Sequence, residues 1–256
     1  MTPPRVLLLG GTTEATALAA AVGERHPASM DLTVSFAGRT SAPTAPHGTV
    51  RVGGFGGVDG LTAYLVEHGT TAVVDALHPF ASTMPFNAAE ACRRTGVPLL
   101  RLMRAPWRPT ADDVWHRARS VAEAATVLAS LAVDRALLTI GRQELDPFRT
   151  LTGTDLLVRT IEPFDLAGAW SARPLLARGP FTAEGEIGLL QRERIEAIVS
   201  KNSGGTATVA KLEAARACAI PVVMVDRPPR PEAEQTASVD DALTWLLARS
   251  RSQASG

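Results

Sequence analysis

Two glycines and two threonines separate an apolar run from a run of alanines near the start of the chain. The apolar run VLLL ends at Leu9, and the turn that follows consists of Gly10, Gly11, Thr12, Thr13 and Glu14. A glycine-lined turn between a buried strand and a helix presents backbone N–H groups, and the helix dipole there favours negative charge. The turn therefore indicates a binding site for a pyrophosphate. A tight turn with a threonine N-cap would give the same pattern, and the GxGxxG spacing is absent.

A second apolar run, DLTVSFA, is followed by Gly38, Arg39 and Thr40. In dinucleotide-binding folds an acidic residue near this position binds the ribose of NAD, whereas an arginine accommodates the 2′-phosphate of NADP. No acidic residue stands here, so Arg39 and its hydroxyl neighbour favour NADP. A solvated loop arginine is the alternative interpretation.

The third apolar run, TAVVDAL, leads into His78, Pro79 and Phe80. Proline restricts the backbone, and the imidazole could act as an acid, as a polar anchor for a ligand, or merely as a loop histidine with a local partner. The preceding GGFGG sequence, residues 53–57, indicates a loop that moves or that lets its backbone approach a flat ligand, with a flexible surface turn as the alternative.

A further turn in the second half of the chain also favours anions. The run IEAIVS is followed by Lys201, Asn202, Ser203 and Gly204, and Lys201 is one of only two lysines. A glycine-softened helix start would look the same. Common catalytic signatures are absent: neither lysine lies in GxxxxGK[ST], the single tyrosine has no lysine four residues on, and neither GxSxG nor HExxH occurs. Histidines and cysteines show no metal-ligand spacing, so we expect no metal.

The elements that must position these turns alternate between strands and helices. Continuous apolar strands between amphipathic helices predict parallel sheets covered on both faces, an α/β fold. The proline-rich segment RAPWRPTADD suggests a boundary, which predicts two Rossmann-like domains, 1–105 and 106–249, with a cofactor cleft between them and a polar tail over 250–256. Strands are expected over 6–10, 31–37, 71–76, 97–103, 114–118, 136–141, 155–161, 195–200 and 221–226, and helices over 15–22, 61–67, 87–94, 121–131, 186–193, 207–217 and 238–250.

Composition excludes several partners. Basic and acidic residues are equal in number, 26 each in 256 residues, so no overall basic field attracts nucleic acid or an anionic membrane. The sequence shows no membrane-spanning apolar run and no signal peptide, and its two cysteines form no CxxC pair. We therefore expect a soluble cytoplasmic protein with free thiols.

Taken in order, these stretches resemble the precorrin-6A reductases of cobalamin biosynthesis. The resemblance runs from Val6 to about Leu247 and rests on LLLGGTTEA, SFAGRT, GGFGG, DALHPFA with NAAEAC, VPLLRLMRAPW, and SKNSGG with IPVVMVDRP. It implies an NADPH-dependent oxidoreductase with two Rossmann-like lobes, without flavin or metal. Such an enzyme delivers hydride to carbon-19 of the macrocycle precorrin-6A, and the product is precorrin-6B.

The resemblance also implies roles for the turns described above. Gly10 and residues 11–14 would lie by the cofactor phosphates or the adjacent ribose, and Gly38, Arg39 and Thr40 by the 2′-phosphate. Residues 78–80 would lie near the nicotinamide, and residues 201–204 would meet cofactor or substrate from the second domain. Candidate proton donors are His78, Lys201, Ser203 or a water, although the macrocycle could dispense with a side-chain acid.

A substrate with many carboxylates suits arginines at the rim of a site, because guanidinium forks pair with carboxylates. Arg101, Arg104 and Arg142 follow predicted strands and are the candidates. Two alternatives remain open at this stage: a reductase for the cobalt-containing analogue of the anaerobic route, and a non-catalytic NADP-binding protein. The chain could be a monomer or a homodimer.

Overall fold

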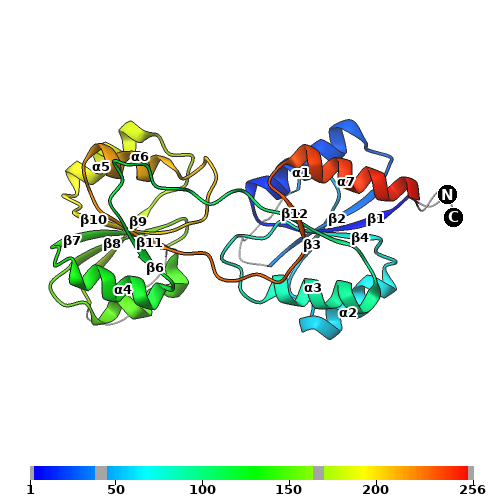
Figure 1. Cartoon of the computed structure of the whole chain (residues 1–256), viewed down its shortest axis with the longest axis horizontal. Coiled ribbons are helices and arrows are strands. Elements are labelled where there is room, and N and C mark those ends of the chain that lie inside the picture. The colour runs from blue at the N-terminus through cyan, green and yellow to red at the C-terminus, as the bar shows by residue number, and fades with distance from the viewer. Residues whose placement is uncertain (1–2, 38–44, 164–169, 253–256) are drawn as a thin grey trace. The chain divides into compact units, whose positions relative to one another are not determined.

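The computed structural model describes residues 3–37, 45–163 and 170–252, and it divides into two compact units (Figure 1). Unit 1 comprises Met1–Ala105 and Pro229–Gly256, and unit 2 comprises Pro106–Pro228. The chain therefore leaves unit 1 after Ala105 and returns to it at Pro229. The assignment of all of 106–249 to the second domain is wrong for the part after Pro228.

Unit 1 contains a six-stranded parallel sheet in the order β12-β5-β4-β1-β2-β3. Its central strands are almost wholly buried, because they are covered on both faces by helices. The strands are β1 (Arg5–Leu9), β2 (Asp31–Phe36), β3 (Thr49–Val52), β4 (Ala72–Asp75), β5 (Leu99–Leu102) and β12 (Glu234–Thr236).

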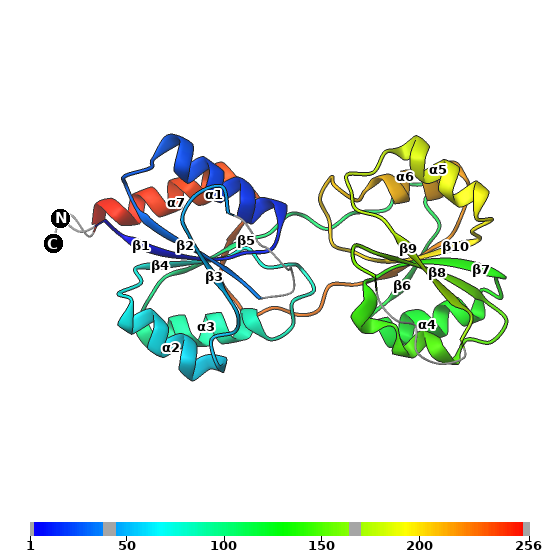
Figure 2. The same ribbon diagram turned by 180° about the vertical axis from the view of Figure 1, so that it is seen from behind.

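Two pairs of helices cover this sheet. The helices α1 (Thr13–Arg25) and α7 (Val239–Ser252) lie on one face, and α2 (Gly57–Glu67) and α3 (Met84–Thr95) lie on the other (Figures 1 and 2). The apolar positions of α7, Leu243, Trp245 and Leu246, join the core formed by α1 and the sheet. Their burial explains why the closing helix belongs to unit 1. Ser238 caps this helix by accepting a hydrogen bond from Asp241 N at 3.2 Å.

Unit 2 has a second six-stranded parallel sheet, in the order β6-β11-β10-β7-β8-β9. One face is covered by α4 (Val121–Ser130) and the other by α5 (Ala183–Arg192) and α6 (Ala210–Ala217) (Figure 2). The strands are β6 (Trp115–Ala118), β7 (Arg135–Thr139), β8 (Asp155–Thr160), β9 (Ala172–Leu176), β10 (Ala197–Lys201) and β11 (Val222–Val225), and the short helices η1 (Arg142–Glu144) and η2 (Asp146–Thr150) follow β7.

Both sheets have the same arrangement, which confirms the predicted α/β class. In each sheet, three strands lie on either side of a central junction, which falls between β1 and β4 in unit 1 and between β7 and β10 in unit 2. The sixth strand lies at the edge of the sheet, next to β5 in unit 1 and next to β11 in unit 2. That sixth strand is β12 in unit 1, from the end of the chain, and β6 in unit 2, which precedes the rest. Each sheet thus has the strand order of a Rossmann fold.

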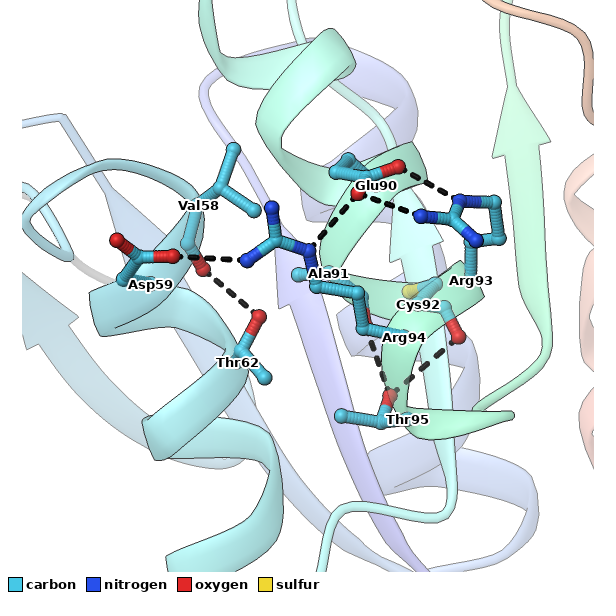
Figure 3. A network of polar contacts seen from close by, with 9 residues as sticks. All are labelled: Val58, Asp59, Thr62, Glu90, Ala91, Cys92, Arg93, Arg94 and Thr95. Carbon is cyan, nitrogen blue, oxygen red and sulfur yellow. Dashed lines mark hydrogen bonds and ion pairs between the residues drawn. The ribbon is translucent and has the colours of Figure 1, made fainter.

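An exposed charge network joins α2 to α3 (Figure 3). Arg94 pairs with Asp59 of α2 and with Glu90 one helical turn earlier, and Arg93 makes two further bonds to Glu90, at 2.7 Å each. These hydrogen bonds to Arg93 and Arg94 lower the pKa of Glu90 to about 2. The Asp59 side chain is 92% exposed, so this surface network orients α3 relative to α2 and adds little to the free energy of unfolding.

Candidate active site

The strand order reverses at one junction in each sheet, between β1 and β4 in unit 1 and between β7 and β10 in unit 2. In doubly wound folds, ligands bind at such a junction, beyond the carboxyl ends of the strands. We call the loops that follow these four strands the switch-point loops: residues 10–14 and 76–83 in unit 1, and residues 140–146 and 202–209 in unit 2. Most of the side chains singled out in the sequence lie on them.

The turn after β1 is held tightly on one side and is open on the other. Gly10 donates its N–H to Ser35 O at 2.8 Å, and a Cβ at this position would lie 3.2 Å from Val34 Cγ1. Gly11 has φ +115°, a conformation that side chains disfavour, yet a Cβ there would meet nothing within 4 Å. The open space and the first-turn amides of α1 fit a phosphate group.

Thr12 joins the two switch-point loops of unit 1. Its Oγ1 caps α1 by accepting from Ala15 N at 3.2 Å, and it donates to Ala76 O at 2.8 Å. The hydroxyl is therefore used within the protein, as the N-cap interpretation expected, rather than held ready for a ligand. Glu14 in the first turn pairs with Arg104 at 2.8 Å, and both side chains are less than one-fifth exposed.

The loop after β4 holds its histidine by a local bond. His78 is exposed, and its Nδ1 lies 3.2 Å from Phe80 N, which donates to it. Because Nδ1 accepts, the neutral imidazole carries its proton on Nε2. The rings of His78 and Phe80 lie 6.0 Å apart, and Pro79 between them is buried.

Beneath this loop lies a buried charge cluster that the sequence did not reveal. Asp75, the last residue of β4, is 0% exposed, and its Oδ2 lies 3.3 Å from Arg101 Nε and 3.5 Å from Arg230 NH1. Its Oδ1 accepts from Leu77 N at 3.2 Å. Arg230 also donates to His78 O at 2.6 Å, and burial lowers the pKa of its guanidinium.

This cluster corrects the role expected of Arg101. The side chain is 4% exposed and bonds to Asp75 and to Pro231 O at 2.8 Å. It is part of the core of unit 1 and does not lie at the rim of a site. Arg104 stays a candidate substrate ligand, although it is paired with Glu14.

Gly38, Arg39 and Thr40 lie outside the described residues. The GGFGG loop, residues 53–57, is held by Arg51, whose NH1 and NH2 donate to Gly53 O at 2.6 Å and Gly54 O at 2.9 Å. The Arg51 guanidinium also lies 3.7 Å from the centroid of the Phe55 ring. A Cβ on Gly60 would lie 1.8 Å from Phe55 O, so glycine at 60 is what allows α2 to begin against this loop.

In unit 2, the turns after β7 and β10 are joined by an ion pair. Lys201, at the end of β10, contacts Glu144 of η1, and the Lys201 side chain is 14% exposed. Gly141 precedes η1 with φ +87°, a conformation that favours glycine. Arg142, the substrate candidate here, is 40% exposed and pairs with Glu162 at 3.1 Å.

Asn202 has a structural partner. Its Oδ1 accepts from Trp107 N at 2.8 Å and its Nδ2 donates to Trp107 O at 3.1 Å, so both ends of the amide hold the chain where it enters unit 2. The indole Nε1 of Trp107 donates to Gly205 O at 2.9 Å. Ser203 is 8% exposed, and Gly204 has φ +69°. The Asn202 side chain is thus bound within unit 2, and the ligand contact expected of this residue stays a prediction. Helix α6 begins at Ala210, three residues later than predicted.

Within residues 3–37, 45–163 and 170–252, no three histidine, cysteine, aspartate or glutamate side chains gather as a metal site would require. In the same part of the chain, no helix has both the length and the apolar character needed to span a bilayer.

The two units place this protein in the Rossmann-like α/β class. In each unit, the loops at the sheet junction have the form of ligand-binding turns. The chain belongs to the precorrin-6x reductase family, CbiJ/CobK, whose model matches residues 5–247. This confirms the family resemblance seen in the sequence. The solved structure of CobK precorrin-6A reductase is similar with a TM-score of 0.88 and 41% identity, and 97% of each chain is covered.

Relatives named as precorrin-6A reductases and as cobalt-precorrin-6A reductases are both similar to this chain over most of their length. The precorrin-6A reductase of Rhodococcus erythropolis is 47% identical over 245 residues, which cover 94% of this chain and 97% of the relative. That of Rhodobacter capsulatus is 42% identical over 243 residues, 94% and 95% of the two chains. The cobalt-precorrin-6A reductase of Priestia megaterium is 30% identical over 235 residues, 87% and 90% of the two chains.

Proposed function

We propose that this chain is an NADPH-dependent precorrin-6A reductase, which delivers hydride to carbon-19 of the macrocycle and yields precorrin-6B. The observation that carries the proposal is the family match over residues 5–247, together with relatives at 40–47% identity that are named precorrin-6A reductases. The reductase class requires a reduced nucleotide, and the switch-point loops of unit 1 have the form that holds one.

The turns of unit 1 would bind the cofactor. The amides of residues 11–14 at the start of α1 would hold the pyrophosphate, and the open face beside Gly11 leaves room for it. Arg39 and Thr40 would contact the 2′-phosphate. His78, Pro79 and Phe80 would lie against the nicotinamide, and NADPH supplies the hydride when it is bound.

The remaining residues would orient the substrate and provide a proton. Arg104 and Arg142 would pair with carboxylates of the macrocycle, each contributing about 1.5–3 kcal/mol when shielded from water. His78 carries its proton on Nε2 in the neutral form, so that atom can donate to a ligand. Lys201 and Ser203 in unit 2 are the other candidate proton donors, and a water could replace all three.

The test is the loss of reduced-nicotinamide absorbance when folded protein is mixed with NADPH and precorrin-6A, with a product whose mass is two hydrogen atoms greater. We expect faster oxidation with NADPH than with NADH. Reactions without precorrin-6A serve as controls. No oxidation by folded protein would contradict the proposal, and NADPH binding without any binding of the macrocycle would favour a non-catalytic role.

A related candidate is the reduction of cobalt-precorrin-6A, which the 30% identity to the Priestia megaterium enzyme favours. Because the metal is held by the ring and not by the protein, the fold does not distinguish the two substrates, whereas the higher identities, 40–47%, are to enzymes named for the metal-free one. The same assay with metal-free and cobalt-loaded macrocycle separates the two, and we expect the metal-free substrate to be preferred.

Replacing Arg39 by alanine should weaken the binding of NADPH far more than that of NADH. The reason is that the guanidinium would pair with the 2′-phosphate, which NADH lacks, and charge-assisted bonds of this kind are worth about 1.5–3 kcal/mol. Titration calorimetry with both nucleotides measures the difference. Equal losses for the two nucleotides would remove Arg39 from the phosphate site.

A further inference from the structure

The segment by which the chain returns from unit 2 to unit 1 contains two arginines. It reads DRPPRP over residues 226–231, and the boundary between the units falls between Pro228 and Pro229. Arg227 is thus the penultimate residue of unit 2, and Arg230 is the second residue of the returning chain. Such a segment has the composition of a plain linker, but each arginine reaches into a switch-point loop of its own unit.

Arg230 holds the backbone of the loop that carries His78. Its NH2 donates to His78 O at 2.6 Å, and its NH1 lies 3.5 Å from Asp75 Oδ2 at the end of β4. The side chain is only 10% exposed. The same carbonyl also accepts from Ala81 N at 2.8 Å, which closes the turn through Pro79 and Phe80. The arginine therefore fixes the start of that turn against the strand that precedes it.

Arg227 holds the corresponding loop of unit 2 through two backbone carbonyls. Its Nε donates to Asn202 O at 2.9 Å and its NH2 donates to Ser203 O at 3.1 Å. The loop is also closed by Ser203 N, which donates to Lys201 O at 2.7 Å. Two successive carbonyls after β10 are thereby fixed by one guanidinium.

Both contacts use the geometry of arginine rather than its charge alone. A guanidinium is a planar fork whose nitrogens reach two acceptors at once, whereas a lysine ammonium is a single point on a flexible stem. The acceptors within the loops are backbone carbonyls, one for Arg230 (His78 O) and two for Arg227, so the arginines determine the path of each loop and leave its side chains unoccupied by this contact. A loop whose carbonyls are fixed by hydrogen bonds is suited to holding a reacting group in place.

We propose that Arg227 and Arg230 are positioning residues, each of which fixes the switch-point loop of its own unit in the geometry needed for hydride transfer. The proposal rests on the proposed function for its catalytic consequence. The contacts themselves do not depend on that function. Neither arginine needs to touch cofactor or substrate.

The first test is hydrogen exchange, followed by mass spectrometry, on the ligand-free full-length protein. Arg230→Lys should speed exchange about tenfold in peptides covering 76–82, because a single ammonium cannot reach His78 O and Asp75 Oδ2 at once as the guanidinium fork does, and should leave 201–206 unchanged. Arg227→Lys should give the opposite pattern. Arg25→Lys is the matched control, since Arg25 pairs with Asp240 at an exposed site in unit 1 and contacts neither loop. Unchanged exchange in both loops would overturn the proposal.

The second test is steady-state kinetics of the same variants with NADPH and precorrin-6A. A misplaced loop should lower kcat by about tenfold to a hundredfold with little change in KM, because alignment and not ground-state binding is lost. A lower melting temperature with an unchanged kcat per folded molecule would mean that the arginines only stabilise the fold, which overturns the positioning role. If the wild-type protein oxidises no NADPH, the proposed function fails, and the exchange experiment still decides whether the loops are held.

Discussion

Replacing Asp75 by asparagine should lower the free energy of unfolding of unit 1 by about 3–5 kcal/mol, because it leaves two buried guanidiniums without their counter-charge. Asp75 is 0% exposed, and Arg101 and Arg230 are 4% and 10% exposed. An asparagine amide would in addition turn N–H groups toward donors, since Leu77 N also points at this side chain. Urea unfolding, with hydrogen exchange to resolve the two units, measures the loss.

A matched control and a double variant make this prediction specific. Asp240→Asn removes the acid of the exposed pair with Arg25, where both side chains are more than half exposed, and should cost no more than about 1 kcal/mol. Combining Asp75→Asn with Arg230→Met should cost less than the sum of the single variants, with a coupling of about 0.5–3 kcal/mol, because one of the two uncompensated charges is then gone. Strict additivity would show that Asp75 and Arg230 do not interact in solution.

The apolar pattern predicted the central strands and the helices between them. The central strands are buried on both faces, so each is a continuous run of apolar residues. The run VLLL is β1, and PVVMV contains β11. The strands β3, β9 and β12 were missed, and each lies at an edge of its sheet. They have little continuous apolar sequence: β12 is three residues long, and β3 and β9 carry several exposed positions.

The place of the closing helix could not be read from local sequence. Its amphipathic pattern fits either sheet, and only the pairing of β12 with β5 and the packing of Leu243 and Leu246 beside α1 assign it to unit 1. A boundary marked by proline shows where the chain leaves a unit. It does not show that the chain returns to the first unit further on.

Strand-end reasoning pointed to the turns at the sheet junctions but could not separate ligand contacts from structural ones. Asn202 follows β10 as expected, whereas Arg101 lies within β5, and their partners are the backbone of Trp107, 95 residues away in the chain, and Asp75. Arg230 was missed because PPRP has the composition of a linker, and its partner Asp75 is 155 residues away. Long-range partners of polar side chains leave no periodic signal.

Unit 2 contains a second buried ion pair. Removing one partner should destabilise unit 2, whereas replacing both partners by apolar residues should not. Arg159 of β8 forms two bonds of 2.9 Å to Glu186 of α5, and the side chains are 8% and 4% exposed. Glu186→Gln should lower the free energy of unfolding of unit 2 by about 3–5 kcal/mol, because the guanidinium stays buried without a carboxylate. Urea unfolding and exchange in unit 2 peptides measure this loss. Glu162→Gln, in the exposed pair with Arg142, is the control and should cost less than about 1 kcal/mol.

The double variant Arg159→Met/Glu186→Leu should recover most of that stability, because apolar side chains of similar size carry no desolvation penalty. The surroundings favour such a replacement: the Phe181 ring centroid lies 4.5 Å from the Arg159 guanidinium carbon, and Arg159 Nε is buried without a hydrogen-bond partner in the structure. The existing pair therefore leaves one polar atom unsatisfied, which an apolar pair would remove. A double variant as unstable as Glu186→Gln would mean that shape, and not charge, holds α5 against β8.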